Sequence, residues 1–389
     1  MNHFLTNIHI TKLYQLEGIY ISLADNKYPH LIITGKNGSG KTVLLNSIAD
    51  ALQIAKNKGS REYGETGVQN IDLTSDTVRI VNKHGDIACS LNNYPEYEND
   101  DFIIVLYQAD RGIKMIEPDS PQKPNINIGD VRKTSSDQFI KFLVDLKFQE
   151  LLSISNQDQE KLMAIKKWFL EFEGLLKAIF EDDNLTLSFE QQKNYSFKIT
   201  KGGQTFGFND MSDGFKAVLN IVADLILRMQ DGSHVSSAYN KKGIVLIDEI
   251  ETHLHLELQK IVLPFLTKIF PNVQFIVTTH SPFVLSSMSN AVAYDLAHQE
   301  PVSDLTKYSY ESLAEGYFGV TAVSSDIRHR LDIIKILLEK NDLSLSETAT
   351  LKNYLIDFDN IPEAVSPSLI GEYLQVKLKN ISRIKEIMQ

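Results

Sequence analysis

The segment Gly35-Lys36-Asn37-Gly38-Ser39-Gly40-Lys41-Thr42 decides the fold of this chain. It matches the pattern G-x-x-x-x-G-K-[ST] of a loop that wraps a phosphate chain between a buried strand and a helix. An apolar run at 30–34 precedes it, and apolar residues recur at helical spacing over 42–52. The glycines leave backbone N–H groups free to contact phosphates, Lys41 suits the β- and γ-phosphates, and Thr42 suits Mg²⁺. We therefore expect an α/β fold that binds ATP with Mg²⁺.

A second buried run, at 243–247, ends in Asp248-Glu249. The carboxyl ends of parallel strands meet at the sheet edge where ligands bind, so both acids are expected beside the phosphate loop. Asp248 is predicted to complete the Mg²⁺ shell, and Glu249 to take a proton from the attacking water. Together with Lys41, these acids predict hydrolysis of the nucleotide as well as binding.

Polar residues follow two other apolar runs. His280, within Thr278-Thr279-His280-Ser281-Pro282, is predicted to hydrogen-bond the γ-phosphate or the attacking water. Gln108 comes directly after the run at 102–107, where its amide oxygen is a candidate Mg²⁺ ligand. Arg111, three residues further on, either reaches a phosphate or is solvated.

The fifth motif is Met211-Ser212-Asp213-Gly214, which is expected to open a helix over 215–229. A serine and a glycine at a helix N-terminus form an anion-binding cradle. Because the chain already has its own phosphate loop, Ser212, Asp213 and Gly214 are predicted to bind the nucleotide of another copy.

With the five motifs in this order, the chain resembles the ABC-type ATPase heads of the RecF and SMC families over about 1–298. The resemblance implies an ABC-type P-loop ATPase head, a mixed sheet flanked by helices, that dimerises head to tail. Two ATP molecules would then lie between Lys41 of one copy and Ser212 and Gly214 of the other. The family signature is usually Leu-Ser-x-Gly-Gln/Glu, whereas Met211 and Phe215 occupy its first and last positions here.

The segment at 248–255, Asp-Glu-Ile-Glu-Thr-His-Leu-His, resembles the D-E-x-E-x-H-L-H-P segment of bacterial RecF-like and OLD-like ATPases. Leu256 stands where those ATPases often have proline. His253 and His255 are not expected to bind a metal, because a spacing of i, i+2 suits two ligands on one helix poorly.

The chain is expected to divide into an ATPase head over 1–300 and a C-terminal helical region over 301–389. A helical insert at about 130–184 interrupts the head and is too short for a long coiled-coil arm. Near the N-terminus, two strands at 8–14 and 18–23 are predicted to reverse at Glu17-Gly18.

The C-terminal region is predicted to contain three helices, near 321–340, 344–358 and 366–388. Ser344 and Glu347 have the spacing of a capping box for the middle helix. This region either docks a partner or another copy, or it caps the edge of the sheet.

The composition of the 389 residues predicts a soluble cytoplasmic protein without a membrane partner. No apolar stretch approaches the roughly 20 residues that cross a bilayer, and the N-terminus lacks the pattern of a signal peptide. The single cysteine, Cys89, fits a reducing compartment. The net charge of −11 disfavours non-specific coating of nucleic acid, although a local basic face leaves DNA contact possible.

The residues after 300 lack a buried strand that ends in acids, so no nuclease domain is expected there. A head of this kind resembles the lone AAA-family ATPases of bacterial anti-phage modules, such as the PtuA family of Septu, which accompanies an HNH nuclease. The resemblance implies an ATP-driven switch that controls a partner effector, expected to be a nuclease. Three alternatives stay open: a RecF-like DNA-repair ATPase that clamps DNA, a transporter subunit, and a nucleotide-gated module that does not hydrolyse ATP.

Overall fold

The computed structural model forms two compact units, Met1–Tyr308 and Ser309–Gln389, which are described separately. The structure describes residues 4–23, 29–57, 68–74, 76–82, 85–92, 101–191, 195–230, 239–302, 305–318, 325–361 and 367–388. Among these residues, no helix is both long enough and apolar enough to cross a membrane.

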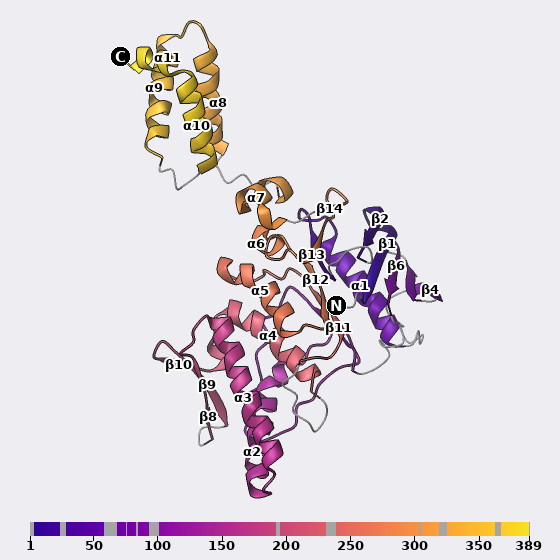
Figure 1. The fold of residues 1–389 in the computed structure, drawn as a ribbon. Helices are drawn as coiled ribbons and strands as arrows, with labels where there is room; N and C mark the ends of the chain where they lie inside the picture. The colour runs from indigo at the N-terminus through magenta and orange to yellow at the C-terminus, as the bar shows by residue number, and fades with distance from the viewer. Residues whose placement is uncertain are drawn as a thin grey trace. The chain divides into compact units, whose positions relative to one another are not determined.

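A six-stranded sheet forms the centre of the first unit, in the order β14-β13-β3-β12-β11-β7 (Figure 1). All its strands are parallel except β14, which pairs antiparallel with β13. Every residue of β3, β7, β11 and β12 is buried, as parallel strands covered on both faces require. The predicted α/β class with a mixed sheet is confirmed. The strands are β3 (His30–Thr34), β7 (Ile103–Tyr107), β11 (Gly243–Ile247), β12 (Val273–Thr278), β13 (Ala291–Asp295) and β14 (Glu300–Val302).

A second, antiparallel sheet has the strand order β2-β1-β6-β5-β4. Helix α1 (Lys41–Lys56) packs with both sheets, and one hydrophobic core contains residues of α1 and of each sheet. This packing fixes the phosphate loop at the start of α1 relative to the central strands. The strands of this sheet are β1 (Leu5–Leu13), β2 (Leu16–Ser22), β4 (Val68–Thr74), β5 (Thr77–Asn82) and β6 (Gly85–Leu91).

The chain reversal between β1 and β2 differs from the prediction. The turn lies at Tyr14-Gln15, where Tyr14 has a φ of 54°, because the buried Leu13 and Leu16 pair directly across the two strands. The turn predicted at Glu17-Gly18 is wrong, since Gly18 adopts its φ of 66° inside β2. Burial of the paired leucines therefore outweighed the turn preference of glycine.

Three helices cover the face of the central sheet opposite α1 (Figure 1): α4 (Asp213–Arg228), α5 (Leu256–Ile269) and α6 (Pro282–Leu285). Helix α4 begins at Asp213, two residues before its predicted start, because Ser212 already has the extended backbone of an N-cap. Ser281 caps α6, and its hydroxyl accepts hydrogen bonds from Phe283 N and Val284 N.

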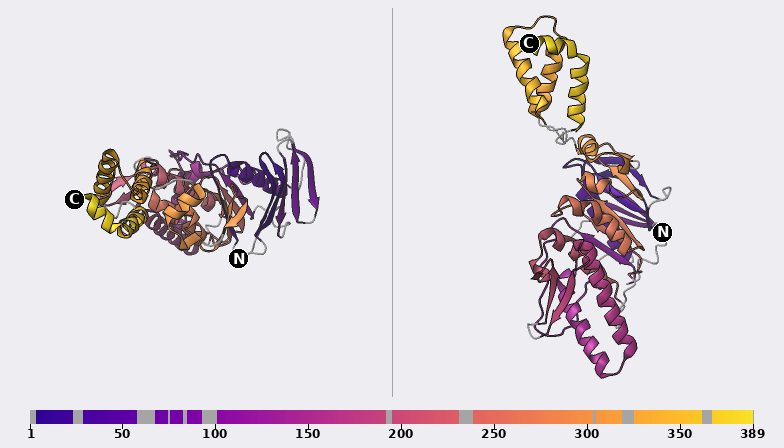
Figure 2. Two further views of the ribbon diagram at one scale, coloured as in Figure 1. Left: turned by 90° about the horizontal axis from the view of Figure 1, so that it is seen from above. Right: turned by 60° about the vertical axis from the view of Figure 1, so that its left-hand side comes forward.

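Between β7 and α4, the chain forms a helical hairpin and a three-stranded sheet of order β10-β9-β8 (Figure 2). The hairpin is held by an aromatic core in which Trp168 stacks on Phe172 and Phe172 contacts Phe139 and Phe208. Both helices lie in the interval predicted to be helical. The elements are η2 (Ser136–Gln138), α2 (Phe139–Ser155), α3 (Gln159–Phe180), β8 (Thr186–Glu190), β9 (Ser196–Lys201), β10 (Gln204–Phe206) and η3 (Phe208–Asp210).

The second unit is helical and has its own core, which includes Leu331, Leu351, Phe358 and Tyr373. The capping box of Ser344 and Glu347 is confirmed. The helix predicted over 366–388 is two helices with Asn380 between them. The start predicted at 321 lies outside the described residues. The helices are α7 (Tyr310–Phe318), α8 (Ser325–Glu339), α9 (Leu345–Asp359), α10 (Pro367–Lys379) and α11 (Ile381–Met388), and the short η4 (Leu305–Lys307) precedes them.

Candidate nucleotide-binding site

The parallel strands bring four of the five sequence motifs to one edge of the central sheet. β3, β12, β11 and β7 are neighbours, and each is followed by a motif at its carboxyl end. The phosphate loop follows β3, Thr279-His280 follows β12, Asp248-Glu249 follows β11, and Gln108 follows β7. This edge is where open α/β sheets bind ligands.

The phosphate loop surrounds the side chain of Lys41, which is only 5% exposed. Its ammonium donates hydrogen bonds to Gly35 O at 2.9 Å and to Lys36 O at 3.3 Å. Burial lowers the pKa of Lys41, and the carboxylates of Glu249, Glu251 and others oppose that effect. The loop thus holds the Lys41 ammonium at the N-terminus of α1.

Packing requires a glycine at position 40 of the loop, and the hydroxyl of Ser39 fits a bound phosphate chain. Gly40, the N-cap of α1, has a left-handed φ of 96°, and a Cβ there would lie 3.2 Å from Leu16 Cδ1. The Ser39 hydroxyl is buried and has no hydrogen-bond partner among the described residues. An unpaired buried hydroxyl costs roughly 1–3 kcal/mol, and a phosphate oxygen would supply the missing acceptor.

A candidate Mg²⁺ site lies between α1 and the end of β11. Thr42 Oγ1 is 3.3 Å from Asp248 Oδ1, and the same carboxylate oxygen accepts a hydrogen bond from Thr278 Oγ1 at 2.6 Å. A hydroxyl and a carboxylate are the oxygen ligands that Mg²⁺ prefers beside nucleotide phosphates. Gln108 is exposed, and its Nε2 lies 3.5 Å from Asn46 Oδ1 on α1, so its amide faces the same helix.

Glu249 follows Asp248 in an unusual backbone conformation. Its φ is 44°, and its N–H donates to Thr278 Oγ1 at 2.7 Å. Its partly buried carboxylate accepts one long hydrogen bond, from Thr252 Oγ1 at 3.3 Å. Backbone strain of this kind is found at functional sites, where the surrounding structure over-determines it.

The buried Arg111 fixes this strained turn, a role that the sequence did not indicate. Its guanidinium donates to the carbonyl oxygens of Asp248 at 2.8 Å, Glu249 at 3.0 Å and Ile250 at 3.2 Å. Arg111 is 3% exposed, and burial lowers its pKa to about 10. The predicted solvation of Arg111 is therefore wrong, and its contact with a phosphate stays a prediction. No local pattern distinguishes an arginine that binds main-chain carbonyls more than 130 residues away.

Asn220 of α4 extends this connection to the helix that carries the fifth motif. Its side-chain amide donates to Arg111 O at 2.6 Å and to Ile113 O at 3.3 Å. Four residues on, Asp224 accepts hydrogen bonds from Tyr107 OH at 2.7 Å and from Ser135 N at 2.5 Å. The segment after β7 is thus attached along the length of α4.

His280 is partly buried at the end of β12. Burial is the main cause that lowers its pKa, and the positive charge of Lys41 acts in the same direction. The neutral imidazole is therefore favoured, with one nitrogen as donor and the other as acceptor. Either nitrogen suits the role predicted for it, which stays a prediction.

The fifth motif is not part of this cluster. Ser212 and Asp213 are exposed, and Ser212 is the N-cap of α4 without using its hydroxyl as a cap. Gly214 is buried against the end of the 248–255 turn, where a Cβ would lie 2.8 Å from His253 O. Phe215 stacks on Phe180 with ring centroids 4.3 Å apart, which explains an aromatic residue at this signature position.

His255 caps α5, with its Nδ1 accepting from Leu258 N at 3.4 Å, whereas His253 lies in the preceding turn with a φ of 68°. The spacing argument assumed that both histidines lie on one helix. That assumption is wrong, because His253 lies in the turn before α5 and His255 is the N-cap of α5. Within the described ranges, no group of three metal-binding side chains is present.

The turn between β1 and β2 also lies beside the phosphate loop. Gln15 Nε2 donates to Gly38 O at 2.7 Å, and the neighbouring Tyr14 is 50% exposed. The sequence could not locate this contact, because it depends on the packing of the antiparallel sheet against α1. It makes the 14–15 turn a candidate wall of the nucleotide site.

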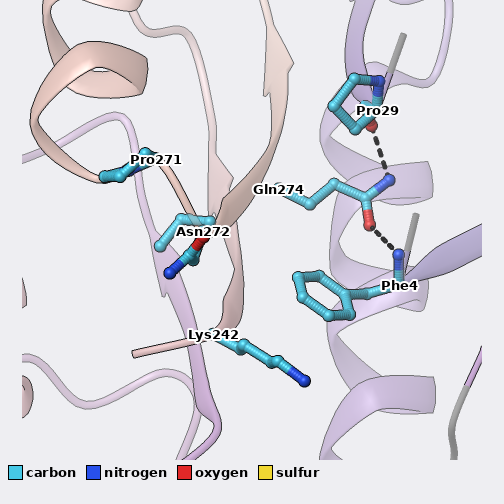
Figure 3. Close-up of a pocket in the computed structure, with 7 residues that line it drawn as sticks. Phe4, Pro29, Lys242, Pro271, Asn272 and Gln274 are labelled. Atoms are coloured by element: carbon cyan, nitrogen blue, oxygen red, sulfur yellow. Dashed lines mark hydrogen bonds between the residues drawn. The ribbon is translucent and has the colours of Figure 1, made fainter. Parts of the chain in front are cut away.

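A pocket of about 230 Å³ lies at the opposite, amino edge of the central sheet (Figure 3). It is lined by Phe4, Pro29, Lys242, Asn272 and Gln274, among others. The Gln274 amide accepts from Phe4 N at 3.1 Å and donates to Pro29 O at 2.6 Å. These bonds tie β12 to the start of β1 and to the residue before β3, so the pocket is distinct from the nucleotide site.

The fold and the site define the class: an α/β domain with a phosphate-loop motif and its other motifs at the carboxyl edge of a mixed sheet. Residues 117–286 match the family model described as "AAA domain, putative AbiEii toxin, Type IV TA system". This match begins after the phosphate loop and includes the 248–255 segment and His280.

Over 390 aligned residues the chain is 25% identical to Septu protein PtuA of Bacillus mycoides (strain KBAB4), covering 92% of this chain and 51% of that protein. It is 31% identical over 137 residues to "Retron Vc95 probable ATPase" of Vibrio cholerae serotype O1 biovar El Tor, covering 35% of this chain and 26% of that protein. A solved SMC head bound to the C-winged helix domain of ScpA covers 77% of this chain and is itself covered to 98%, with 13% identity and a TM-score of 0.43. The chain is thus homologous to Septu PtuA and spans about half or less of the length of the two curated relatives.

Proposed function

We propose that this protein binds and hydrolyses ATP and uses that cycle as a switch. The observation that carries the proposal is the convergence of Lys41, Thr42, Asp248, Glu249 and His280 at one edge of the sheet. The loop from Gly35 to Thr42 binds the phosphates, and Thr42, Asp248 and Gln108 are the candidate Mg²⁺ ligands. When bound there, Mg²⁺ would neutralise charge on the β- and γ-phosphates.

Glu249 is the proposed general base. Among the described residues its carboxylate accepts one long hydrogen bond, so it is available to take a proton from water. Neutral His280 is proposed to hydrogen-bond the γ-phosphate or the attacking water. Lys41 is proposed to stabilise charge that develops on the transferred phosphoryl group.

Completion of the site is proposed to require a second copy of the chain, joined head to tail. The exposed Ser212 hydroxyl caps no helix N–H, which leaves it available for a phosphate of the other copy. Buried Gly214 brings the start of α4 close to the backbone of the 248–255 turn. The N–H groups at the start of α4 would complete the anion cradle.

The proposed biological role is control of a partner effector in bacterial anti-phage defence. Homology to Septu PtuA supports this role over DNA repair. We propose an ATPase head over 1–300, an insert at about 130–184, and a C-terminal region at 301–389 that serves assembly or partner docking. The expected effector is an HNH nuclease. Co-elution of the chain with the product of its adjacent gene in size-exclusion chromatography would support this role, and separate elution would contradict it.

Substitution Glu249→Gln tests the ATPase mechanism. We expect turnover to fall by about 100-fold or more, because the amide cannot accept the proton, while ATP binding persists. Light scattering should then show a trapped ATP-bound dimer or higher oligomer. Glu257→Gln is the matched control, because the exposed Glu257 pairs with Lys260 on the surface of α5. Equal mass for the wild type and Glu249→Gln in ATP would refute the dimer mechanism.

A further inference from the structure

Two glutamates, Glu249 and Glu251, stand two residues apart in the turn after β11, and their carboxylates have different surroundings. The Glu249 carboxylate accepts one hydrogen bond, at 3.3 Å from Thr252. Both oxygens of Glu251 are engaged: Oε1 accepts from His280 N at 2.5 Å, and Oε2 accepts from Thr279 Oγ1 at 2.8 Å. Glu251 is therefore poorly placed to act as a base and well placed to hold the loop that carries His280.

We propose that Glu251 is a positioning residue, whose carboxylate fixes the 279–281 loop and thereby sets where the His280 imidazole stands in the nucleotide site. This inference rests on the proposed ATPase function and deepens it. Glu251 acts through His280, and we assign it no contact with the nucleotide.

The loop is anchored on the other side of His280 as well. Ser281 N donates to Thr279 Oγ1 at 2.9 Å, and Ser281 Oγ donates to Gln259 Oε1 at 2.7 Å. Gln259 in turn donates to Leu254 O at 2.8 Å. The 251–259 segment thus bonds to Thr279, to the N–H of His280 and to Ser281. The backbone that carries the imidazole is therefore fixed on both sides of His280.

The chemistry of the two donors explains why a carboxylate stands at this position. In this arrangement a backbone N–H and a hydroxyl both donate, and a carboxylate offers an acceptor oxygen to each. A glutamine offers one acceptor oxygen, and its NH2 group would replace the acceptor of the other donor, so at least one of the two bonds must change. Burial raises the pKa of Glu251, while the bonds from His280 and Thr279 oppose that rise. Keeping a partly buried acid beside Glu249 costs free energy, and the hydrogen bonds to the loop offset part of that cost.

A double-mutant cycle with His280 tests the inference. We expect Glu251→Gln and Thr279→Val each to lower kcat by about 10-fold, with KM changed less than about 2-fold, because misplacing a catalytic group by a fraction of an ångström has effects of this size. Thr279→Ser retains the hydroxyl and should keep kcat within about 2-fold of the wild type. In a His280→Ala background, Glu251→Gln should lower kcat by less than a further 2-fold or so, since coupled residues are not additive.

The inference is overturned if Glu251→Gln leaves kcat unchanged, or if its effect multiplies with that of His280→Ala. A second measurement does not depend on turnover. Hydrogen exchange of the His280 amide should be slow in the wild type and about 10-fold or more faster in Glu251→Ala, which removes the acceptor. Unchanged exchange would overturn the inference by itself. A wild type that binds ATP without turnover would refute the proposed hydrolysis, and the exchange experiment would still decide the role of Glu251.

Discussion

Helices α1 and α4 both begin at a motif predicted to bind phosphate, and the two N-termini have different surroundings. At α1, the buried ammonium of Lys41 lies inside the loop, and Thr42 lies 3.3 Å from Asp248. At α4, Ser212 and Asp213 are exposed, and only Gly214 is buried, against the backbone of His253. The first N-terminus has a buried positive charge that suits a phosphate and oxygen atoms that suit Mg²⁺. The second offers a hydroxyl and backbone N–H groups, which suits it to complete a site on another copy.

The largest expected effect comes from a substitution at the N-terminus of α1. Lys41→Ala removes the charge that the loop surrounds and should raise the Kd for a fluorescent ATP analogue by about 10- to 100-fold, since a hydrogen bond to a charged group contributes roughly 1.5–3 kcal/mol. Lys167→Ala is the matched control, because the exposed Lys167 lies on α3, outside the phosphate loop, and pairs with Glu171. Equal affinities for the two variants would show that the buried lysine does not bind phosphate.

The next effect separates two serine N-caps, Ser212 of α4 and Ser344 of α9. Ser212 does not use its hydroxyl as a cap, whereas Ser344 accepts from Glu347 N in a capping box. Ser212→Ala should weaken ATP-dependent association by about 10-fold and leave thermal unfolding unchanged, because the contact proposed for this hydroxyl is with the other copy. Ser344→Ala should lower the stability of its unit by about 1 kcal/mol and leave the association unchanged. Light scattering and calorimetry measure the two properties, and a reversed pattern would assign Ser212 a structural role.

A smaller effect is expected at the wall of the α1 site. Gln15→Ala removes the 2.7 Å hydrogen bond to Gly38 O and should raise KM for ATP by about 3-fold, because one neutral hydrogen bond contributes roughly 1 kcal/mol or less. The exposed Lys12 on the preceding strand, paired with Glu17, provides the control Lys12→Ala, which should leave KM unchanged. A KM for Gln15→Ala equal to that of the wild type would remove this turn from the site.

The smallest effect concerns pH. An ordinary histidine, with a pKa near 6.5, would be half protonated at about pH 6.5. Burial lowers the pKa of His280, so more than half of the molecules keep the neutral imidazole at that pH. We expect kcat at about pH 6.5 to retain more than half of its value at about pH 7.5, and the decline at lower pH to be reduced in His280→Ala. A decline of kcat centred above pH 7 would contradict a lowered pKa of His280.

The phosphate loop shows how much of the site local sequence predicts. Its glycines, Lys41 and Thr42 are adjacent in the chain, and the buried strand and helix that flank it have recognisable patterns. Because parallel strands share a carboxyl edge, the sequence also predicted that Asp248 and His280 would meet the loop. Their roles in binding and catalysis stay predictions.

The contacts of Arg111, Glu251 and Gln15 were not predictable in the same way. Each bonds to a main-chain group or side chain that is distant in sequence. Glu251 belongs to the 248–255 segment, but that pattern does not say which groups its carboxylate binds. The misplaced β1–β2 turn has a related cause, because the burial of Leu13 and Leu16 decided the register.

The sequence by itself determined the α/β class, the phosphate loop and the edge at which the motifs meet, because strand and helix periodicity and the glycine pattern are local properties. Only the tertiary structure decided which side chains hold the motifs in place. Arg111 binds the strained Glu249 turn, and Glu251 binds the His280 loop, because buried polar groups must find partners wherever the packed chain places them. That requirement is met in three dimensions and leaves no periodic trace in the sequence.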